Sequence, residues 1–489
     1  MKSSARILVH ESRGDEVISR HLYGHFAEHL GRGIYDGIWF RRDGKWELRE
    51  DIVEALRRIR VPNIRWPGGC FADGYDWKDG VGPLDSRPAI VNSIWAGVTE
   101  DNSFGTHEFM DLVERLGAEA VIVGNVGSGT VREMAEWWRY MNHPGPGPMA
   151  DLRKSNGREK PWNVRFWGVG NENWGCGGNM RPAYYADLYK RFASFLHPID
   201  GHWPFRIAAG PAGDNYDWME VVLREAAKQI DGIDLHHYTL VGNWSKKGAA
   251  TGFPESEWME LLAKAYDLDG LLRHHIAIMD RYDPEKRIWL ILGEWGTWHE
   301  VEAGTHRGFL HQQNTLRDAI AASISLNILN CHAGRVKMAN IAQTVNVLQA
   351  MVLTRGEEML LTPTYHVFDL YTPHHDARLM STSVRAPSYT LDGQTIPSVS
   401  ASASKADDGS FHLTLCNVHP HVSIDTSVEF PSEVSDYTAR ILTGPEMDSR
   451  NTFEDPDAVR LEEFSIEAAG TGSATFLLPA RSVVAITAR

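Results

Sequence analysis

Short apolar segments alternate with longer amphipathic segments from about residue 20 to residue 345. Each apolar segment has the length of a strand and ends in polar residues, whereas the segments between them repeat apolar residues at helical spacing. Alternating strands and helices predict a parallel sheet with covered faces, and eight such units predict a closed (β/α)8 TIM barrel. The expected strands are 21–30, 61–69, 120–129, 164–172, 205–211, 232–239, 288–296 and 336–343, and the expected helices are 48–59, 106–117, 130–142, 183–196, 219–230 and 257–282.

The pattern changes after about residue 377. Short β-rich runs separated by Gly, Asp, Asn and Pro follow, and they predict a β-sandwich of the jelly-roll type. The β-rich stretch 5–12 precedes the first barrel strand, so we assign it to the same sandwich. The predicted domains are therefore an N-terminal strand region (1–18), a catalytic barrel (19–377) and a C-terminal sandwich (378–489). Residues 142–161 are rich in Pro and Gly and are predicted to form a loop or an insertion.

Composition limits the partners of this chain. Its 489 residues exceed what one hydrophobic core usually serves, which agrees with a large domain and a smaller one. A formal net charge of -15 argues against nucleic acid or an anionic membrane as the main partner and favours a neutral substrate. The N-terminal stretch lacks an apolar signal region, and no apolar run reaches the roughly 20 residues of a membrane-spanning helix.

The four cysteines, Cys70, Cys176, Cys331 and Cys416, are scattered and form no CxxC pair. Such spacing is more typical of reduced thiols than of a disulfide framework. Together with the N-terminal sequence, it predicts a cytoplasmic protein with free thiols.

The predicted barrel strands end in unusual polar residues. They are Glu28, Arg65 with Cys70, Asn125, Asn171 with Glu172, His236 with Tyr238, and Glu294 with Trp295. Since active residues of such barrels lie at the carboxyl ends of the strands, these side chains are expected to meet in one site.

Glu172 follows the fourth predicted strand, and Glu294 ends the seventh. Two carboxylates on opposite walls of a pocket suit glycosidic bond cleavage, in which one protonates the leaving oxygen and the other attacks the sugar carbon or activates water. Either residue alone is equally well interpreted as a buried structural acid. The pair, surrounded by Asn, His, Tyr and Trp, favours catalysis.

The neighbouring residues have plausible functional and structural interpretations. Arg65 would hold a carboxylate ionised, or simply form a structural ion pair. Asn171 would donate to a sugar hydroxyl, or cap a loop. Tyr238 would donate to the nucleophile, or only pack its ring. Flat faces for sugar rings are offered by Trp95, Trp174, Trp295 and Trp298, although most of the 17 tryptophans must belong to the core.

Metal and nucleotide sites are not favoured. Adjacent histidine pairs occur at His236-His237, His274-His275 and His374-His375, but adjacent histidines on a strand point to opposite faces and cannot easily share one ion. No HExxH or clustered Cys/His spacing is present. The stretch NVGSGT lacks the spacing of a dinucleotide fingerprint, and there is no P-loop or GxSxG motif.

A series of motifs in register resembles glycoside hydrolase family 51, the α-L-arabinofuranosidases. These motifs are YGHFAEHLGRGIYDGIW, RWPGGCFADGYDWKDGVGP, DNSFGTHEFMDL, NVGSGTV, WGVGNENWGCGG, DLHHYT, LGEWGTWH and MANIAQTVNVLQAM. The resemblance implies a (β/α)8 barrel with a C-terminal β-sandwich that takes in the N-terminal strand, a retaining mechanism without metal or organic cofactor, and a homo-oligomer.

The resemblance also implies residue roles. Glu172 in GNEN is similar to the acid/base and Glu294 in GEWG to the nucleophile. Substrate contacts are implied for Glu28, Arg65, Trp95, Asn171, His236 and Tyr238. We add Cys70 and Trp295 as candidate contacts, because they lie at the ends of predicted strands. Two departures concern fine specificity: Cys70 stands where many members have Asn, and Leu361 stands where many carry a sugar-binding Gln.

The sequence therefore predicts an exo-acting, retaining α-L-arabinofuranosidase that acts on arabinoxylan- or arabinan-derived oligosaccharides. A β-xylosidase or endoglucanase on the same barrel remains an alternative. So does an inactive carbohydrate-binding protein, although the presence of both acids disfavours it.

Overall fold

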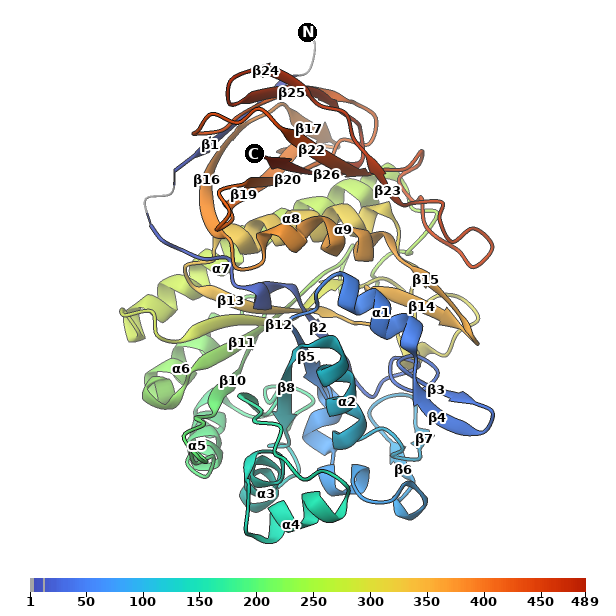
Figure 1. Ribbon diagram of the computed structural model, residues 1–489, viewed down its shortest axis with the longest axis vertical. Coiled ribbons are helices and arrows are strands. Elements are labelled where there is room, and N and C mark those ends of the chain that lie inside the picture. Colours follow the sequence, from blue (N-terminus) through green and yellow to red (C-terminus); the bar gives the residue numbers. More distant parts are fainter. Residues whose placement is uncertain (1–3, 12–13) are drawn as a thin grey trace.

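The protein consists of a barrel and a β-sheet domain stacked along its long axis (Figure 1). The computed structural model describes residues 4–11 and 14–489, so residues 1–3 and 12–13 of the predicted N-terminal strand region lie outside the described residues. The chain starts in the sheet domain, forms the barrel, and returns to the sheet domain to end there.

Eight parallel strands close the barrel in the order β10-β11-β12-β13-β2-β5-β8-β9, which confirms the predicted fold class. Near the amino-terminal ends of the strands, inward side chains fill the barrel with an apolar cluster that includes Val121, Phe166 and Ile291. The strands are β2 (Gly24–Phe26), β5 (Asn63–Trp66), β8 (Glu119–Gly124), β9 (Phe166–Val169), β10 (Phe205–Ala212), β11 (Gly232–Thr239), β12 (Trp289–Thr297) and β13 (Val336–Ala342).

Helices cover the outside of the barrel, including the six that were predicted from their apolar spacing. They are α1 (Glu50–Arg58), α2 (Thr106–Leu116), α3 (Val131–Asn142), α4 (Pro148–Ser155), α5 (Pro182–Ala193), α6 (Tyr216–Ala226), α7 (Glu255–Tyr282), α8 (Leu316–Cys331) and α9 (Pro363–Tyr371). Helix α4 lies within 142–161, where a loop or an insertion was predicted, so the stretch is not a loop throughout. Pro148 occupies the first turn of α4, where a missing N–H costs nothing. Arg153 of the same helix is buried and donates to the carbonyls of Tyr140 and His143.

Helix α8 lies between the barrel and the sheet domain (Figure 1) and is buried along nearly its whole length. Its Asn327 and Asn330 donate to Ser400 and Ser402 of the sheet, and Tyr371 of α9 donates to Asn327. These bonds satisfy the polar groups that the interface buries.

The sheet domain is one ten-stranded sheet that folds over on itself, in the order β23-β22-β26-β20-β19-β16-β1-β21-β25-β24. Strand β16 (Arg378–Arg385) joins the two layers, because its first residues pair with β19 and its last residues pair with β1. The other strands are β1 (Ser4–His10), β19 (Val399–Lys405), β20 (Phe411–Asn417), β21 (Ile424–Glu429), β22 (Tyr437–Leu442), β23 (Leu461–Glu463), β24 (Glu467–Gly470), β25 (Ser473–Leu478) and β26 (Ser482–Ala488). The N-terminal strand β1 thus belongs to this domain.

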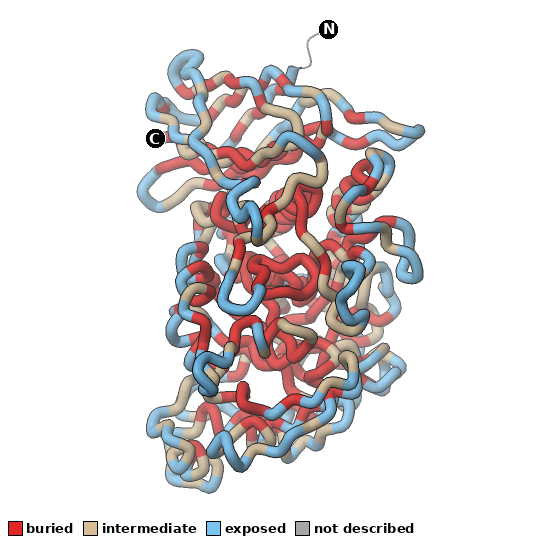
Figure 2. The backbone as a smooth tube through the Cα atoms, turned by 90° about the vertical axis from the view of Figure 1, so that its right-hand side faces the viewer, coloured by how far each residue is buried: buried red, intermediate tan, exposed pale blue. Residues whose placement is uncertain are grey.

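Four two-stranded hairpins project from loops: β3 (Trp39–Arg42) with β4 (Lys45–Leu48), β6 (Ile90–Asn92) with β7 (Val98–Glu100), β14 (Val352–Arg355) with β15 (Glu358–Leu361), and β17 (Ser388–Leu391) with β18 (Gln394–Pro397). Figure 2 shows that buried segments concentrate in the barrel and beneath the sheet domain, while exposed segments follow the loops. In the described part of the chain, no helix combines the length and the apolar character needed to cross a membrane.

Candidate active site

The two predicted acids stand at the carboxyl ends of the fourth and seventh barrel strands. Glu172 lies three residues beyond β9, and Glu294 lies within β12. Gly170 makes the turn that presents Glu172: its φ is +87°, and a Cβ there would approach Asn173 Oδ1 to 2.1 Å. A residue with a side chain would be strained in that conformation, so the glycine fixes the position of the acid.

Glu294 is buried and surrounded by donors. Arg65 Nη1 donates to its Oε1 at 2.9 Å, the Tyr238 hydroxyl donates to its Oε2 at 2.8 Å, and His236 Nδ1 lies 3.6 Å from Oε2. Burial raises the pKa of Glu294, while the charges of His236 and Arg65 act in the opposite direction. Both carboxylate oxygens therefore have a partner that favours the ionised form.

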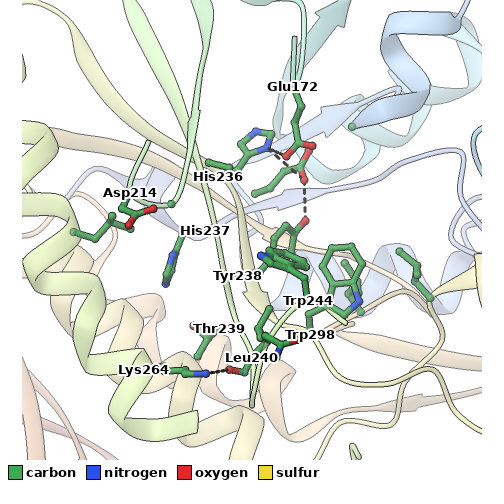
Figure 3. A pocket seen from close by; sticks show the side chains of 18 of the residues that line it. Glu172, Asp214, His236, His237, Tyr238, Thr239, Leu240, Trp244, Lys264 and Trp298 are labelled. Atoms are coloured by element: carbon green, nitrogen blue, oxygen red, sulfur yellow. Dashed lines mark hydrogen bonds and ion pairs between the residues drawn. The ribbon is translucent and has the colours of Figure 1, made fainter. Parts of the chain in front are cut away.

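Glu172 and Glu294 both lie next to His236, and Figure 3 shows Glu172 beside His236. His236 Nδ1 lies 2.8 Å from Glu172 Oε1, and its Nε2 lies 3.2 Å from Asp234 Oδ2. Burial by itself would lower the pKa of His236, but Glu294, Asp234 and Glu172 together raise this pKa to about 10. The imidazolium can donate from both nitrogens, and an oxygen of Glu172 lies within 4.8 Å of an oxygen of Glu294.

A third glutamate, Glu28, forms another wall of the cavity. Its Oε1 accepts from the Phe71 amide at 3.0 Å and from Trp95 Nε1 at 2.9 Å, and its Oε2 accepts from Gln343 Nε2 at 3.2 Å. Burial and the charge of Glu294 raise the pKa of Glu28 to about 8. A Cβ at Gly69 would come within 2.9 Å of both Glu28 oxygens, which explains the glycine pair before Cys70.

Most of the predicted site residues line one cavity of about 950 Å³. Those that line it are Glu28, Cys70, Trp95, Glu172, His236, Tyr238 and Glu294, and Trp174 and Trp298 line it as well. Arg65 and Asn171 are buried beside it: Arg65 Nη2 donates to Asn171 Oδ1 at 2.6 Å. The contacts of Arg65 agree with the prediction that it holds a carboxylate. Neither Arg65 nor Asn171 forms part of the cavity surface.

The prediction of a sugar-facing Trp295 is wrong. Its side chain is buried and stacks near Phe368, with ring centroids 6.2 Å apart. Successive residues of a strand point to opposite faces, so Glu294 facing the cavity turns Trp295 toward the helices.

The prediction of four free thiols is also wrong. Cys70 and Cys176 form a disulfide, which ties the loop after β5 to the loop after β9, while Cys331 and Cys416 are free. Cys176 Sγ lies 3.7 Å from Glu172 Oε2, so the bridge adjoins an acid. The sequence hides this pairing because 106 residues separate the two cysteines.

The departure attributed to Leu361 is likewise corrected. Leu361 ends β15 and does not line the cavity, whereas Gln343, at the end of β13, lines it and donates to Glu28. A glutamine is therefore present, and the sequence interpretation placed it in the wrong segment.

Two buried aspartates were missed. Asp73 accepts from the amides of Val126, Gly127 and Asn171 and so joins three strand-end loops; burial raises its pKa to about 6. Asp234 accepts from the Gly293 amide at 2.7 Å and contacts His236. Period-two spacing from His236 and Tyr238 was the signal that would have found Asp234.

Two trios of ligand-type side chains gather among the described residues, but neither fits a metal ion. In the trio of Cys70, Glu172 and Cys176, both sulfurs belong to the disulfide. In the trio of Glu172, His236 and Glu294, the raised pKa of His236 favours an imidazolium, which cannot act as a ligand.

Known proteins resemble the chain over nearly its whole length. Residues 55–250 match the α-L-arabinofuranosidase 1 domain, and residues 293–482 match the α-L-arabinofuranosidase C-terminal domain. An intracellular exo-α-L-arabinofuranosidase of Bacteroides ovatus is 45% identical, covering 99% of this chain and 96% of the relative.

Solved structures agree with this similarity. The GH51 arabinofuranosidase from Xanthomonas axonopodis pv. citri superposes with a TM-score of 0.98 at 44% identity, covering 100% of both chains. The α-L-arabinofuranosidase from Thermotoga maritima in its arabinose complex superposes with a TM-score of 0.86 at 31% identity, covering 99% of both chains.

Proposed function

Since this chain belongs to glycoside hydrolase family 51, the α-L-arabinofuranosidases, we propose that it is an exo-acting α-L-arabinofuranosidase that works with retention of configuration. The observation that carries the proposal is the pair of acids at the ends of β9 and β12. An oxygen of Glu172 lies within 4.8 Å of an oxygen of Glu294. This close approach of two oxygens supports the carboxyl-group separation of about 5–5.5 Å of a retaining pair, rather than the about 6.5–9.5 Å that an inverting pair needs to admit a water molecule.

In the proposed first step, Glu294 attacks the anomeric carbon while Glu172 protonates the leaving oxygen. The bond to the leaving group breaks, and a glycosyl ester forms on Glu294. Arg65 and Tyr238 support this role, because each donates to one oxygen of Glu294 and keeps it ionised and oriented.

In the second step, Glu172 accepts a proton from water, and the water oxygen attacks the anomeric carbon. The ester bond breaks, and Glu294 is released as a carboxylate. His236 lies between the two acids and donates to Glu172, so it positions the group that transfers protons in both steps.

Substrate binding is assigned to the walls of the cavity. Glu28, held by Trp95 and Gln343, is placed to contact sugar hydroxyls beside the anomeric carbon. Trp95, Trp174 and Trp298 offer apolar faces to sugar rings. The proposed substrates are oligosaccharides derived from arabinoxylan or arabinan, and the proposed location of the enzyme is the cytoplasm. The similarity to an intracellular exo-α-L-arabinofuranosidase of Bacteroides ovatus supports this location. We also propose a homo-oligomer, which light scattering after size-exclusion chromatography would test.

Turnover of a small panel of aryl glycosides tests the proposal. The aryl α-L-arabinofuranoside should be cleaved at least about a hundredfold faster, as kcat/KM, than the aryl β-D-xylopyranoside, because contacts to ring hydroxyls discriminate strongly. Preference for the xylopyranoside, or for cellulose, would favour the alternative enzymes on this barrel. Sugar binding without turnover of any substrate would favour a carbohydrate-binding protein.

A further inference from the structure

The cavity that holds the two acids is larger than one five-carbon sugar requires. Its volume of about 950 Å³ lies near the top of the range of roughly 300–1,000 Å³ found for small-molecule sites. From the acids it extends in two directions, which Figure 3 shows on the two sides of Tyr238. Trp244 and Trp298 lie on one side, and Asp214 and His237 lie on the other.

The second direction leads across the ends of β10 and β11 to helix α7. We call this part the α7 groove, and it is lined by Asp214, Tyr216, Asp267, Gly270, Leu271 and His274. No role has been assigned to these residues above. Because the groove and the acids line the same cavity, a molecule held at Glu172 can continue into the groove.

Gly270 is the most informative residue of the α7 groove. It lies within the 28-residue helix α7, where glycine is less favourable than alanine. Its φ is not in the left-handed region, and a Cβ placed there would meet no heavy atom within 4 Å. Neither the backbone nor the packing therefore requires glycine, and the missing side chain leaves the groove open at this turn of the helix.

The two carboxylates of the groove are available for hydrogen bonds, whereas the Tyr216 hydroxyl and His274 Nδ1 contact each other at 3.2 Å. Among the described residues, the exposed carboxylates of Asp214 and Asp267 form no side-chain hydrogen bond or ion pair, and His237 Nε2 is buried without a partner. Figure 3 shows His237 on the same side as Asp214. A chain of sugar hydroxyls supplies the donors that two carboxylates accept.

The charge of the groove limits what it can bind. Lys264, which also lines the cavity, is occupied by the carbonyls of Leu240 and Gly242 and by an ion pair with Glu260. Asp214 and Asp267 are thus carboxylates of the groove without an ion-pair partner among the described residues, and they would repel another carboxylate. The half-buried ring of Tyr216 adds an apolar face with a polar tip, which suits a sugar ring.

We propose that the α7 groove binds the neutral sugar chain from which the arabinofuranosyl group is released, and that it disfavours chains that carry a uronic acid near the branch. The proposal rests on the function proposed above. It assigns to Gly270 and Asp267 a part in substrate choice, not in bond cleavage.

The test compares Gly270→Leu with Gly270→Ala on two substrates, an aryl α-L-arabinofuranoside and a neutral oligosaccharide with an arabinofuranosyl branch. Gly270→Leu should lower kcat/KM on the oligosaccharide at least about tenfold through KM, and change it by less than about twofold on the aryl substrate. Gly270→Ala removes the same helical glycine but adds little volume, so both substrates should keep their values within about twofold. Activity on the aryl substrate also shows that each variant is folded.

Equal losses on both substrates, or no loss on the oligosaccharide, would overturn the assignment of the groove. Lack of wild-type turnover on the aryl arabinofuranoside would instead contradict the proposed function. In a second comparison, the wild type should prefer the neutral oligosaccharide over one that bears a uronic acid, and Asp267→Asn should reduce that preference several-fold. An unchanged preference would refute the charge selection.

Discussion

Replacing Arg65 by methionine should change both the pH profile and the stability of this family 51 enzyme. The guanidinium is only 2% exposed, donates to Glu294 at 2.9 Å and lies 3.6 Å from Asp234. Methionine preserves much of the volume but removes the charge. Two buried carboxylates then lose the cation that faces them.

The magnitude follows from this geometry. A hydrogen bond to a charged group contributes about 1.5–3 kcal/mol, which corresponds to roughly one to two pKa units. Arg65 lowers the pKa of Glu294, so its removal raises that pKa. If Glu294 must be ionised to attack, the acidic limb of kcat/KM should move to higher pH by one to two units. Breaking a buried ion pair should also cost about 3–5 kcal/mol of unfolding free energy at neutral pH, and less as acid protonates the carboxylates.

The assay is the pH dependence of kcat/KM on an aryl arabinofuranoside, together with chemical denaturation. Arg335→Met is the matched control, because Arg335 is 3% exposed and pairs with Asp283 at 3.0 Å outside the cavity. It should destabilise the protein comparably while leaving the acidic limb in place. The reasoning is refuted if the limb moves equally in both variants or in neither.

Two further predictions concern stability. Reduction of the Cys70–Cys176 bridge, or Cys70→Ala, should lower the free energy of unfolding by up to about 5 kcal/mol, because the bridge closes a loop of 106 residues. Dithiothreitol should have no additional effect on Cys70→Ala, and a further loss of stability in that variant would contradict the assignment of the disulfide. Asp318→Asn should cost about 3–5 kcal/mol at pH 7, since hydrogen bonds from His299 and Thr297 and the charge of Arg317 hold the pKa of this buried carboxylate at about 2 against the effect of burial. The loss should vanish as pH falls toward 2, and a pH-independent loss in urea titrations would contradict this.

The barrel was predictable because its information is local. Each barrel strand is a short apolar run that ends in polar residues, and the helices between them repeat at helical spacing. The two acids were predictable for the same reason, since the carboxyl ends of all eight strands meet at one face. Helix α4 was missed because its Pro and Gly content outweighed Pro148, which is a helix-start signal.

The features that the sequence did not reveal depend on contacts between residues that lie far apart in the chain. Cys70 and Cys176 lie in different loops, and nothing in their spacing indicates that the barrel brings them together. Asp73 is placed by amides of two other loops, so its own neighbours in sequence do not reveal its role. Trp295 was misassigned although strand alternation, applied from Glu294, would have placed it on the outer face.

The distinct roles of Glu172 and Glu294 are the central claim, and the configuration of an azide product tests them most directly. In Glu172→Ala, a good aryl leaving group needs little protonation, so the ester on Glu294 still forms, and azide can attack it without a general base. We expect azide to accelerate turnover of the activated arabinofuranoside and to give the arabinosyl azide with retained configuration.

In Glu294→Ala the nucleophile is missing, so any azide product must come from direct displacement and must be inverted. Nuclear magnetic resonance of the two products distinguishes these outcomes. Retention with Glu172→Ala and inversion with Glu294→Ala is the predicted result, and the reverse assignment would contradict the account.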